Sequence, residues 1–217
     1  MHSDTTGSWT PVALSTDLPA GTVMPAQIPA ASIALWRSGS GRAAASADRC
    51  PHRGMRLSHG FVRGEALSCI YHGWRYAQTG NCLRIPAHPE LIPPETIRVA
   101  TFAIEESDGI IWVALGQPEG GPPRLEGLVP LRSLTVLAGV AAIETAAAAN
   151  VNPEGLLEFN QSLGPIYLLL SAQERDKTLV HVLLKATTDL TASIAASRAI
   201  ESLRRSAEDL QTKAIAP

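Results

Sequence analysis

The first half of the chain alternates short apolar runs with turns. Between residues 9 and about 116, Gly, Pro and Ser recur every few positions and separate runs of β-type residues, which is typical of a small all-β domain. Ser107, Asp108 and Gly109 form a hairpin signal between the last two runs. We therefore expect strands over residues 10–14, 22–28, 32–36, 42–46, 66–69, 74–77, 97–104 and 109–115.

The second half has a simpler pattern. The segment QPEGGPPRLEG at residues 117–127 contains Pro and Gly that block regular structure, so we expect a linker over 117–133. Strands are predicted over 134–145, 166–171 and 179–186, with a polar turn at 173–177 joining the last two.

A helix is predicted to close the chain after a cap at Thr188 or Asp189, with Glu201 placed to pair with Arg204 or Arg205. Its apolar stripe recurs at steps of three and four and comprises Ala196, Ile200, Leu203, Ala207, Leu210 and Ala214. The expected fold is mainly β: an antiparallel β domain over 1–116, then a short α+β region over 134–217 that ends in one long helix.

Composition narrows the function classes. The chain has 217 residues, a net charge of -2 and a pI near 6.3, so there is no bulk positive field to attract nucleic acid. No basic segment followed by an apolar stretch opens the chain, and the apolar stretch at 136–149 is interrupted by Glu144. We expect a cytoplasmic protein with no membrane segment. Three cysteines are too few for a disulfide framework and indicate metal or redox chemistry.

Two Cys-His pairs carry the chemistry. Cys50 and His52 are separated by one residue, Cys69 and His72 by two, and each pair lies in a Gly-containing loop between predicted strands. Two such loops side by side can present four ligands to a [2Fe-2S] cluster, with two thiolates on one iron and two neutral imidazoles on the other. Having imidazoles in place of two thiolates removes negative charge near one iron, which makes adding an electron easier and localises it on the histidine side.

The segments CPHRGMRLSHG and CIYHGWRY resemble the Rieske iron-sulfur domain found at the N-terminus of Rieske non-haem iron oxygenases. The resemblance extends from about Trp9 to Gly116 and includes NCLRIPAHPE and GIIWVALG. It implies that Cys50 and Cys69 bind the inner iron and that His52 and His72 bind the outer one. The alternatives are a Cys2His2 zinc site, whose pairs are usually spaced more widely than Cys50 and His52, and four unliganded core residues.

Neighbouring residues refine this interpretation. Rieske proteins of respiratory and photosynthetic complexes carry an extra cysteine in each loop, joined as a disulfide, and a serine hydroxyl near the cluster. This chain has Met55 and Tyr71 in place of the two cysteines and Trp74 in place of the serine, so it has neither feature. The resemblance therefore implies the low end of the Rieske potential range, about -150 mV. We interpret Cys82 as a packing thiol, and His59 and His88 as hydrogen-bonding loop residues. Trp74, Tyr71 and Tyr76 either shield the cluster from water or are ordinary core residues. Arg53 and Arg56 present charge to an acidic partner or are simply solvated.

The second half lacks the family's other iron site. The oxygenases bind a mononuclear iron through two histidines and a carboxylate, whereas the only histidine after the linker is His181, in the apolar run LVHVLLK. This half resembles a much reduced helix-grip fold only at the level of pattern.

We therefore predict an electron carrier that takes single electrons from a reductase or ferredoxin and passes them to a separate acceptor such as a mononuclear-iron oxygenase. The alternatives are a divergent oxygenase that uses His181 with Asp or Glu, or with ligands from another copy in an oligomer, and a redox-sensing binding protein.

Overall fold

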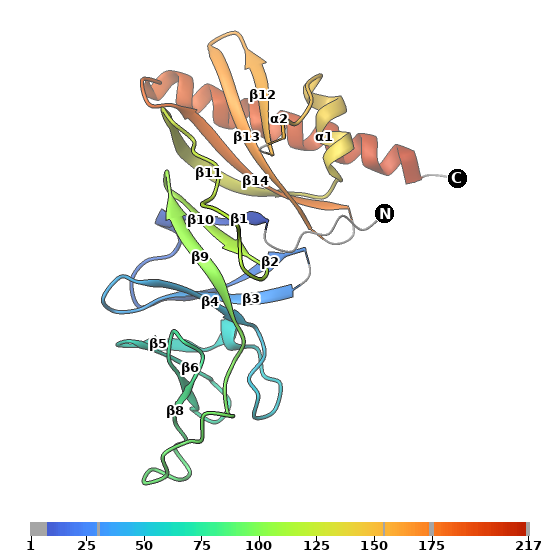
Figure 1. Ribbon diagram of the computed structural model, residues 1–217. Helices are drawn as coiled ribbons and strands as arrows, with labels where there is room; N and C mark the ends of the chain where they lie inside the picture. Colours follow the sequence, from blue (N-terminus) through green and yellow to red (C-terminus); the bar gives the residue numbers. More distant parts are fainter. Residues whose placement is uncertain (1–7, 30, 154, 174–175, 216–217) are drawn as a thin grey trace. The chain divides into compact units, whose positions relative to one another are not determined.

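The computed structural model describes residues 8–29, 31–153, 155–173 and 176–215, which divide into two compact units (Figure 1). The first unit runs up to Glu106 and includes Ile111–Pro122. The second comprises Ser107–Ile110 and the chain from Pro123 onward. Strand β11 (Leu128–Val136) begins inside the segment expected to be linker, because Pro130 is tolerated next to a bulge in the pairing with β14.

A six-stranded sheet forms the larger part of the first unit, in the order β1-β10-β9-β4-β3-β2. Strand β3, which lies between β4 and the edge strand β2, has the continuous apolar run Ile33 to Trp36, and both of its faces are buried. Ile33 and Leu35 pack into one core cluster, whereas Ala34 and Trp36 pack into the other. The strands are β1 (Trp9–Leu14), β2 (Val23–Ile28), β3 (Ala31–Arg37), β4 (Ala43–Ala47), β9 (Thr101–Ser107) and β10 (Ile110–Ala114).

A second, smaller sheet of the same unit carries the second Cys-His loop between β6 and β7, and the first Cys-His loop lies in the connection from β4 of the larger sheet to β5 of the smaller one. Its order is β5-β6-β7-β8, and all three pairings are antiparallel. Its core is shared with Trp36 and includes Leu57, Leu67 and Tyr76. The elements are β5 (Phe61–Arg63), β6 (Ala66–Ser68), β7 (Arg75–Tyr76) and β8 (Cys82–Arg84), with 3₁₀ turns at Ser15–Asp17 and Leu57–His59 elsewhere in the unit.

Most of the strands expected in the first half are confirmed to within two residues. The strand expected over 97–104 is wrong in its first half, because β9 starts at Thr101. Before it, the Ile97 N–H donates to Pro94 O and the Val99 N–H to Gly80 O, so these residues close turns and bridges instead of extending a ladder. Strands β5 and β8 were not expected, since three residues are too few to establish a period.

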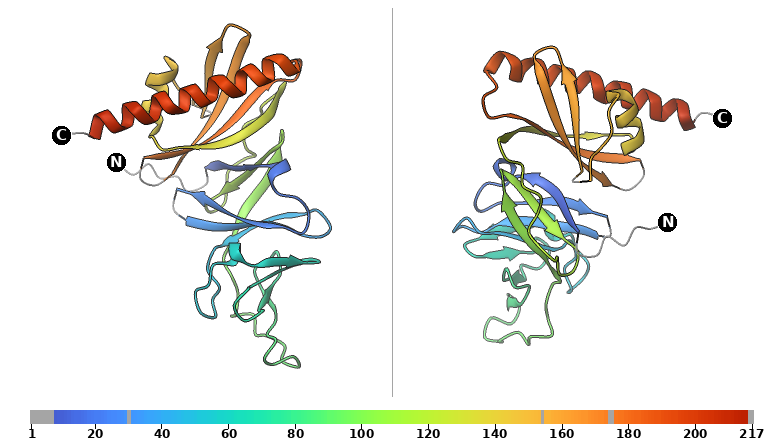
Figure 2. Two further views of the ribbon diagram at one scale, coloured as in Figure 1. Left: turned by 180° about the vertical axis from the view of Figure 1, so that it is seen from behind. Right: turned by 45° about the horizontal axis from the view of Figure 1, so that its top comes forward.

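In the second unit a four-stranded antiparallel sheet packs against a long helix. The sheet order is β11-β14-β13-β12, with β12 at Leu156–Gln161, β13 at Gly164–Gln173 and β14 at Lys177–Lys185. Helix α2 (Leu190–Ile215) crosses one face of this sheet (Figure 2). Apolar residues from both layers fill the core between them: Val136, Leu168, Val180 and Val182 from the sheet, and Ala196, Ile200, Leu203 and Ala207 from the helix.

The helix begins and pairs as the sequence predicts. The Oδ1 of Asp189 accepts a hydrogen bond from the Ala192 N–H at 2.8 Å, which caps the first turn. Glu201 forms an ion pair with Arg204 at 3.0 Å and also one with Arg132 of β11. Although α2 has 26 residues, no helix in the described part of the chain is apolar enough over a sufficient length to cross a membrane.

The strand expected over 134–145 is wrong in its second half. After β11 ends at Val136, Gly139 interrupts the extended chain and helix α1 (Val140–Ala147) follows. Alanine is the strongest helix former, and its abundance here outweighs the apolar run that suggested a strand. Ile143 is 1% exposed and packs into the core shared with α2, so tertiary contacts also stabilise the helix.

Candidate metal centre

The first Cys-His loop, residues 50–55 (loop 1), is closed by two backbone hydrogen bonds. The Cys50 N–H donates to Met55 O at 2.8 Å, and the Gly54 N–H donates to Cys50 O at 2.8 Å. Gly54 has φ of +70°, a conformation that costs a side-chain-bearing residue about 1–2 kcal/mol. The glycine therefore lets the chain turn back immediately after His52.

The second loop, residues 69–74 (loop 2), repeats this backbone pattern. The Cys69 N–H donates to Trp74 O at 2.9 Å, the Gly73 N–H donates to Cys69 O at 3.0 Å, and Gly73 also has φ of +70°. A Cβ on Gly73 would lie 3.0 Å from Cγ of Pro86, so the chain after β8 packs against this loop. The two loops are thus built alike, although their histidines lie two and three residues after the cysteine.

The two thiols lie inside. Cys50 and Cys69 are 3% and 2% exposed and belong to the core cluster of the smaller sheet. Burial raises the pKa of the Cys69 thiol above its ordinary value, and the neighbouring Cys50 adds to the rise. A metal that binds Cys69 as a thiolate must therefore displace its proton.

The two imidazoles lie side by side and nearer to solvent. The ring centroids of His52 and His72 are 4.6 Å apart, with His52 half-buried and His72 exposed. The His52 ring stacks on Trp74 at 4.4 Å, and the His72 ring lies 3.9 Å from that of Tyr71. Desolvation lowers the pKa of His52, and the adjacent His72 lowers it further, which favours the neutral ring that a metal binds.

These donors suit a two-iron cluster of the Rieske kind. Such a cluster takes two thiolates on one iron and two neutral imidazoles on the other, and this site offers a buried cysteine pair and an outer histidine pair. In the described residues, no three His, Cys, Asp or Glu side chains gather as ligands of a single metal ion. The four side chains are arranged as two pairs, which matches the donor set of the cluster.

A buried carboxylate, that of Asp48, connects the chain before loop 1 to the chain after it through hydrogen bonds to Ser58. Asp48 is 2% exposed; its Oδ1 accepts from the Ser58 N–H at 2.7 Å and its Oδ2 accepts from the Ser58 Oγ–H at 2.8 Å. Arg56 lies 3.8 Å from the same carboxylate. No local pattern marks this pair, because Asp48 and Ser58 are ten residues apart and neither is one of the Cys and His residues of the motif.

Replacement of Asp48 by alanine should lower the free energy of unfolding by about 3 kcal/mol, because two buried donors of Ser58 lose their acceptor. Asparagine is the matched control, since its amide can accept from the Ser58 N–H and donate to the Ser58 oxygen. Chemical denaturation of both variants measures the difference. An equal loss of unfolding free energy for the two substitutions would show that the contact of Asp48 with Ser58 depends on the charge of the carboxylate and not on hydrogen bonding.

The other residues singled out in the sequence lie around the site without joining it. Cys82 is 6% exposed with its Sγ 3.7 Å from Arg84 O, and none of the three cysteines forms a disulfide. His59 and His88 are exposed. Tyr76, by contrast, contacts a predicted ligand directly. Its hydroxyl lies 3.0 Å from Cys50 Sγ, and the side chain is 1% exposed.

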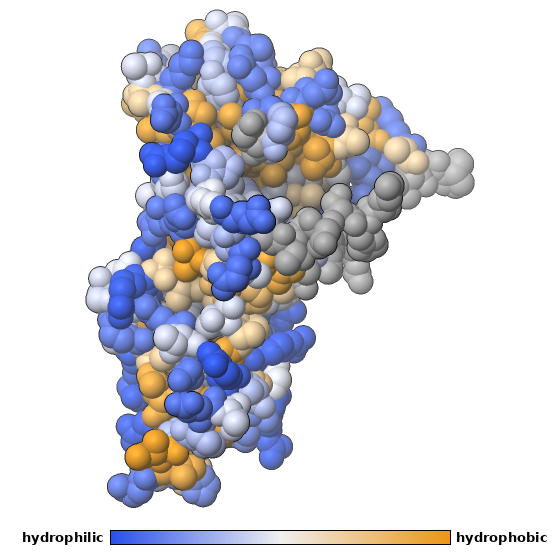
Figure 3. All heavy atoms as spheres, in the orientation of Figure 1, coloured by the Kyte–Doolittle hydropathy of each residue, from blue (hydrophilic) through white to orange (hydrophobic). Residues whose placement is uncertain are grey.

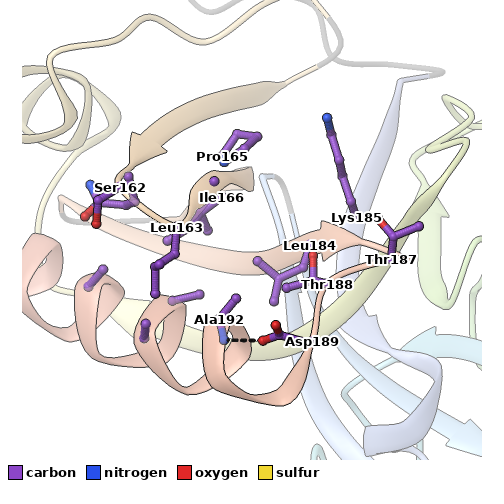
Figure 4. Close-up of a pocket in the computed structure, with 15 residues that line it drawn as sticks. Ser162, Leu163, Pro165, Ile166, Leu184, Lys185, Thr187, Thr188, Asp189 and Ala192 are labelled. Carbon is purple, nitrogen blue, oxygen red and sulfur yellow. Dashed lines mark hydrogen bonds between the residues drawn. The ribbon is translucent and has the colours of Figure 1, made fainter.

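His181 lies in the second unit, in β14. It is fully buried, and its Nδ1 is 2.8 Å from Ser133 Oγ. A cavity of about 320 Å³ in that unit opens between the β12–β13 hairpin, the end of β14 and the start of α2 (Figure 4). Asp189 is the only carboxylate among its described lining residues, and no histidine lines it.

Comparison with known proteins identifies the first unit. The family model of the Rieske [2Fe-2S] domain matches residues 8–103. The oxidoreductase NdmD of Pseudomonas putida is 44% identical over 123 residues, which cover 56% of this chain and 21% of that protein. A 4beta-methylsterol monooxygenase of Methylococcus capsulatus is 42% identical over 106 residues, which cover 44% of this chain and 28% of that protein.

The chain thus spans less than a third of the length of these two curated relatives. Among solved structures, apo dicamba monooxygenase aligns with a TM-score of 0.76 at 18% identity, over 96% of this chain and 87% of that one, a similarity of fold. Residues 8–103 are therefore a Rieske [2Fe-2S] domain, similar in sequence to the corresponding part of these two relatives, and its cofactor is a Rieske-type [2Fe-2S] cluster.

Proposed function

We propose that this chain is a one-electron carrier whose cluster is held by Cys50 and Cys69 on one iron and by His52 and His72 on the other. When bound, the cluster supplies a centre that gains and loses one electron at a time. The shared backbone pattern of the two loops and the pairing of like donors support this ligand assignment.

The surrounding residues would give the site an inner and an outer side. The buried cysteines keep their ligand atoms away from water, and Trp74 fixes the ring plane of His52 by stacking on it. His72 is exposed, so its ring edge offers the shortest route between the site and a docked protein. We therefore assign electron entry and exit to the histidine side.

One observation favours a carrier over an oxygenase: the chain after residue 117 contains a single histidine. A mononuclear iron held by two histidines and a carboxylate needs two imidazoles, and His181 supplies one at most. His181 is also fully buried, with its Nδ1 engaged by Ser133. We propose that electrons come from a reductase or ferredoxin and pass to a separate mononuclear-iron oxygenase.

The purified protein, reduced by a ferredoxin or a reductase and mixed with a separate Rieske-system oxygenase, tests the carrier function. The carrier account predicts that the oxygenase turns over only when this chain is present, and that this chain alone forms no product from the same substrate and dioxygen. Failure to accept an electron from any such donor would refute it.

A second candidate is a divergent oxygenase that acts by itself. It is supported by the fold similarity to dicamba monooxygenase, which extends over 96% of this chain and so includes the second unit. Its missing imidazole would have to come from another copy of the chain. Product formed by this chain with a reductant and no second oxygenase would favour this candidate over the carrier.

Replacement of Tyr76 by phenylalanine should lower the midpoint potential by about 40 mV. Burial, together with the adjacent Cys50, raises the pKa of Tyr76, so the hydroxyl keeps its proton and can donate to the Cys50 sulfur. A hydrogen bond to a ligand sulfur favours the more negative reduced state, and a difference of about 1 kcal/mol corresponds to about 40 mV for one electron. A redox titration gives the shift; an unchanged potential would contradict the contact.

The wild-type midpoint potential should lie near the low end of the Rieske range, about -150 mV. The hydroxyl of Tyr76 is one donor toward the site, but loop 2 has Trp74 where a serine hydroxyl would add a second. Each missing donor leaves the reduced state less stable. Spectroelectrochemical titration measures the potential, and a midpoint well above zero would overturn this expectation.

A further inference from the structure

Positive charge is concentrated in one stretch of the first unit. Residues 49–84 contain one acidic residue, Glu65, in a chain whose net charge is -2. The stretch has no lysine and six arginines: Arg49, Arg53, Arg56, Arg63, Arg75 and Arg84. Both Cys-His loops lie within it, so the formal charge of the stretch that contains the histidines is positive although the net charge of the chain is negative.

Arg49 and Arg56 flank loop 1, Arg53 lies within it, and all three are exposed. Nη1 of Arg49 donates to Gly54 O at 3.0 Å, which holds this guanidinium against the loop. Arg56 is partly neutralised by Asp48 at 3.8 Å. Among the described residues, Arg49 and Arg53 have no carboxylate within ion-pair distance. Their charge is therefore available to a partner.

Two more arginines follow loop 2. Arg75 of β7 and Arg84 of β8 are register partners in the small sheet, one half-buried and the other exposed. Like charges directly opposite each other on neighbouring strands destabilise a sheet. No carboxylate of the described residues forms an ion pair with either of them. An anionic surface from outside the chain would relieve this repulsion.

Apolar side chains lie between these charges. In loop 2, Ile70 is 58% and Tyr71 is 56% exposed, next to the exposed His72. The loop after β8, which contacts loop 2 through Pro86, adds the 88% exposed Ile92. Figure 3 shows hydrophobic and strongly hydrophilic residues interspersed at the end of the unit where this loop lies. An apolar centre with a charged rim is the usual composition of a protein interface.

We propose that the basic face, defined as Arg49, Arg53, Arg56, Arg75 and Arg84, docks an acidic electron-donor protein beside His72. The proposal rests on the proposed function, since it names the class of partner that delivers the electron. One electron leaves the donor protein, which is oxidised, and enters this chain, which is reduced. Charge attraction accelerates the encounter, and a small apolar centre allows the donor to leave before the acceptor binds.

The test uses a reduced plant-type [2Fe-2S] ferredoxin of acidic surface as the probe. Stopped-flow spectroscopy gives the second-order rate of reduction of the oxidised, cluster-loaded chain between about 20 mM and about 500 mM salt, where screening removes long-range attraction. Binding of the oxidised ferredoxin, which transfers no electron, is measured by calorimetry under the same conditions. The variants are Arg53→Glu and Arg84→Glu, and Arg205→Glu on α2 is the control with the same charge change.

We expect the wild-type rate to fall at least about tenfold across this salt range, as electrostatic steering predicts. Arg53→Glu and Arg84→Glu should each weaken binding and lower the low-salt rate about tenfold, and should approach wild type at high salt. Arg205→Glu should stay within about twofold. A salt-independent rate, or an equal loss for all three variants, would overturn the docking proposal.

Iron content and midpoint potential of every variant separate this proposal from the proposed function. If the wild-type chain holds a cluster that mediators reduce, but the ferredoxin neither binds nor responds to salt, docking on the basic face is wrong and the carrier function stands. If mediators cannot reduce the wild-type chain, the proposed function itself fails.

Discussion

Replacement of Cys50 or Cys69 by serine should remove iron and sulfide from the purified protein almost completely. Each cysteine supplies one of two thiolates to a single iron, and a serine oxygen is too hard a ligand to replace a thiolate. Both side chains are at most 3% exposed, so the substitution also buries a hydroxyl for which the site has no designed partner. Metal and acid-labile sulfide analysis measures the loss directly.

Cys82→Ser is the matched control for this experiment. Cys82 is also buried in the core of the small sheet, but its Sγ faces Arg84 O at 3.7 Å and it has no place in the ligand set. This variant should keep wild-type iron and sulfide. Loss of the cluster from Cys82→Ser, with retention in Cys50→Ser or Cys69→Ser, would refute the ligand assignment.

Replacement of His72 by cysteine should retain iron and lower the midpoint potential by about 100 mV or more. A thiolate adds a negative charge at the outer iron, and all-cysteine [2Fe-2S] centres of the plant type lie near about -400 mV, well below the Rieske range. Because His72 is exposed and forms the surface side of loop 2, the new side chain has room there. Redox titration and the EPR spectrum of the reduced variant measure the change.

The control is His88→Cys, which places a new cysteine on another exposed loop of the same unit. Its potential should match wild type within the error of the titration. An equal shift in both variants would mean that the added surface cysteine, and not ligand exchange, moves the potential. An unchanged potential in His72→Cys would remove His72 from the proposed ligand set.

Elements whose signals lie within a few neighbouring residues could be predicted from the sequence. The Cys-His spacing and the glycine that follows each histidine predicted two matching loops, because both signals lie within six residues. The strands of the first sheet and the cap of α2 at Asp189 were predictable for the same reason. The ligand assignment itself stays a prediction until metal analysis is made.

Features that depend on tertiary contact could not be predicted. Tyr76 reaches Cys50 from 26 positions away, and Asp48 meets Ser58 across loop 1, so no local pattern marks either pair. Helix α1 was missed because its short apolar run was assigned to a strand, although its alanines favour a helix, and the packing against α2 that stabilises it is a tertiary contact. The pairing of Arg75 with Arg84 depends on a bulged register that the sequence does not specify.

Iron and acid-labile sulfide per chain, measured together with the EPR spectrum of the dithionite-reduced protein, test the central claim most directly. The account predicts about two irons and two sulfides per chain and a rhombic Rieske signal as the only iron signal. Bound zinc without sulfide would contradict the cluster assignment. A third iron outside the cluster would contradict the carrier function, because it would mean that the chain has a mononuclear site of its own.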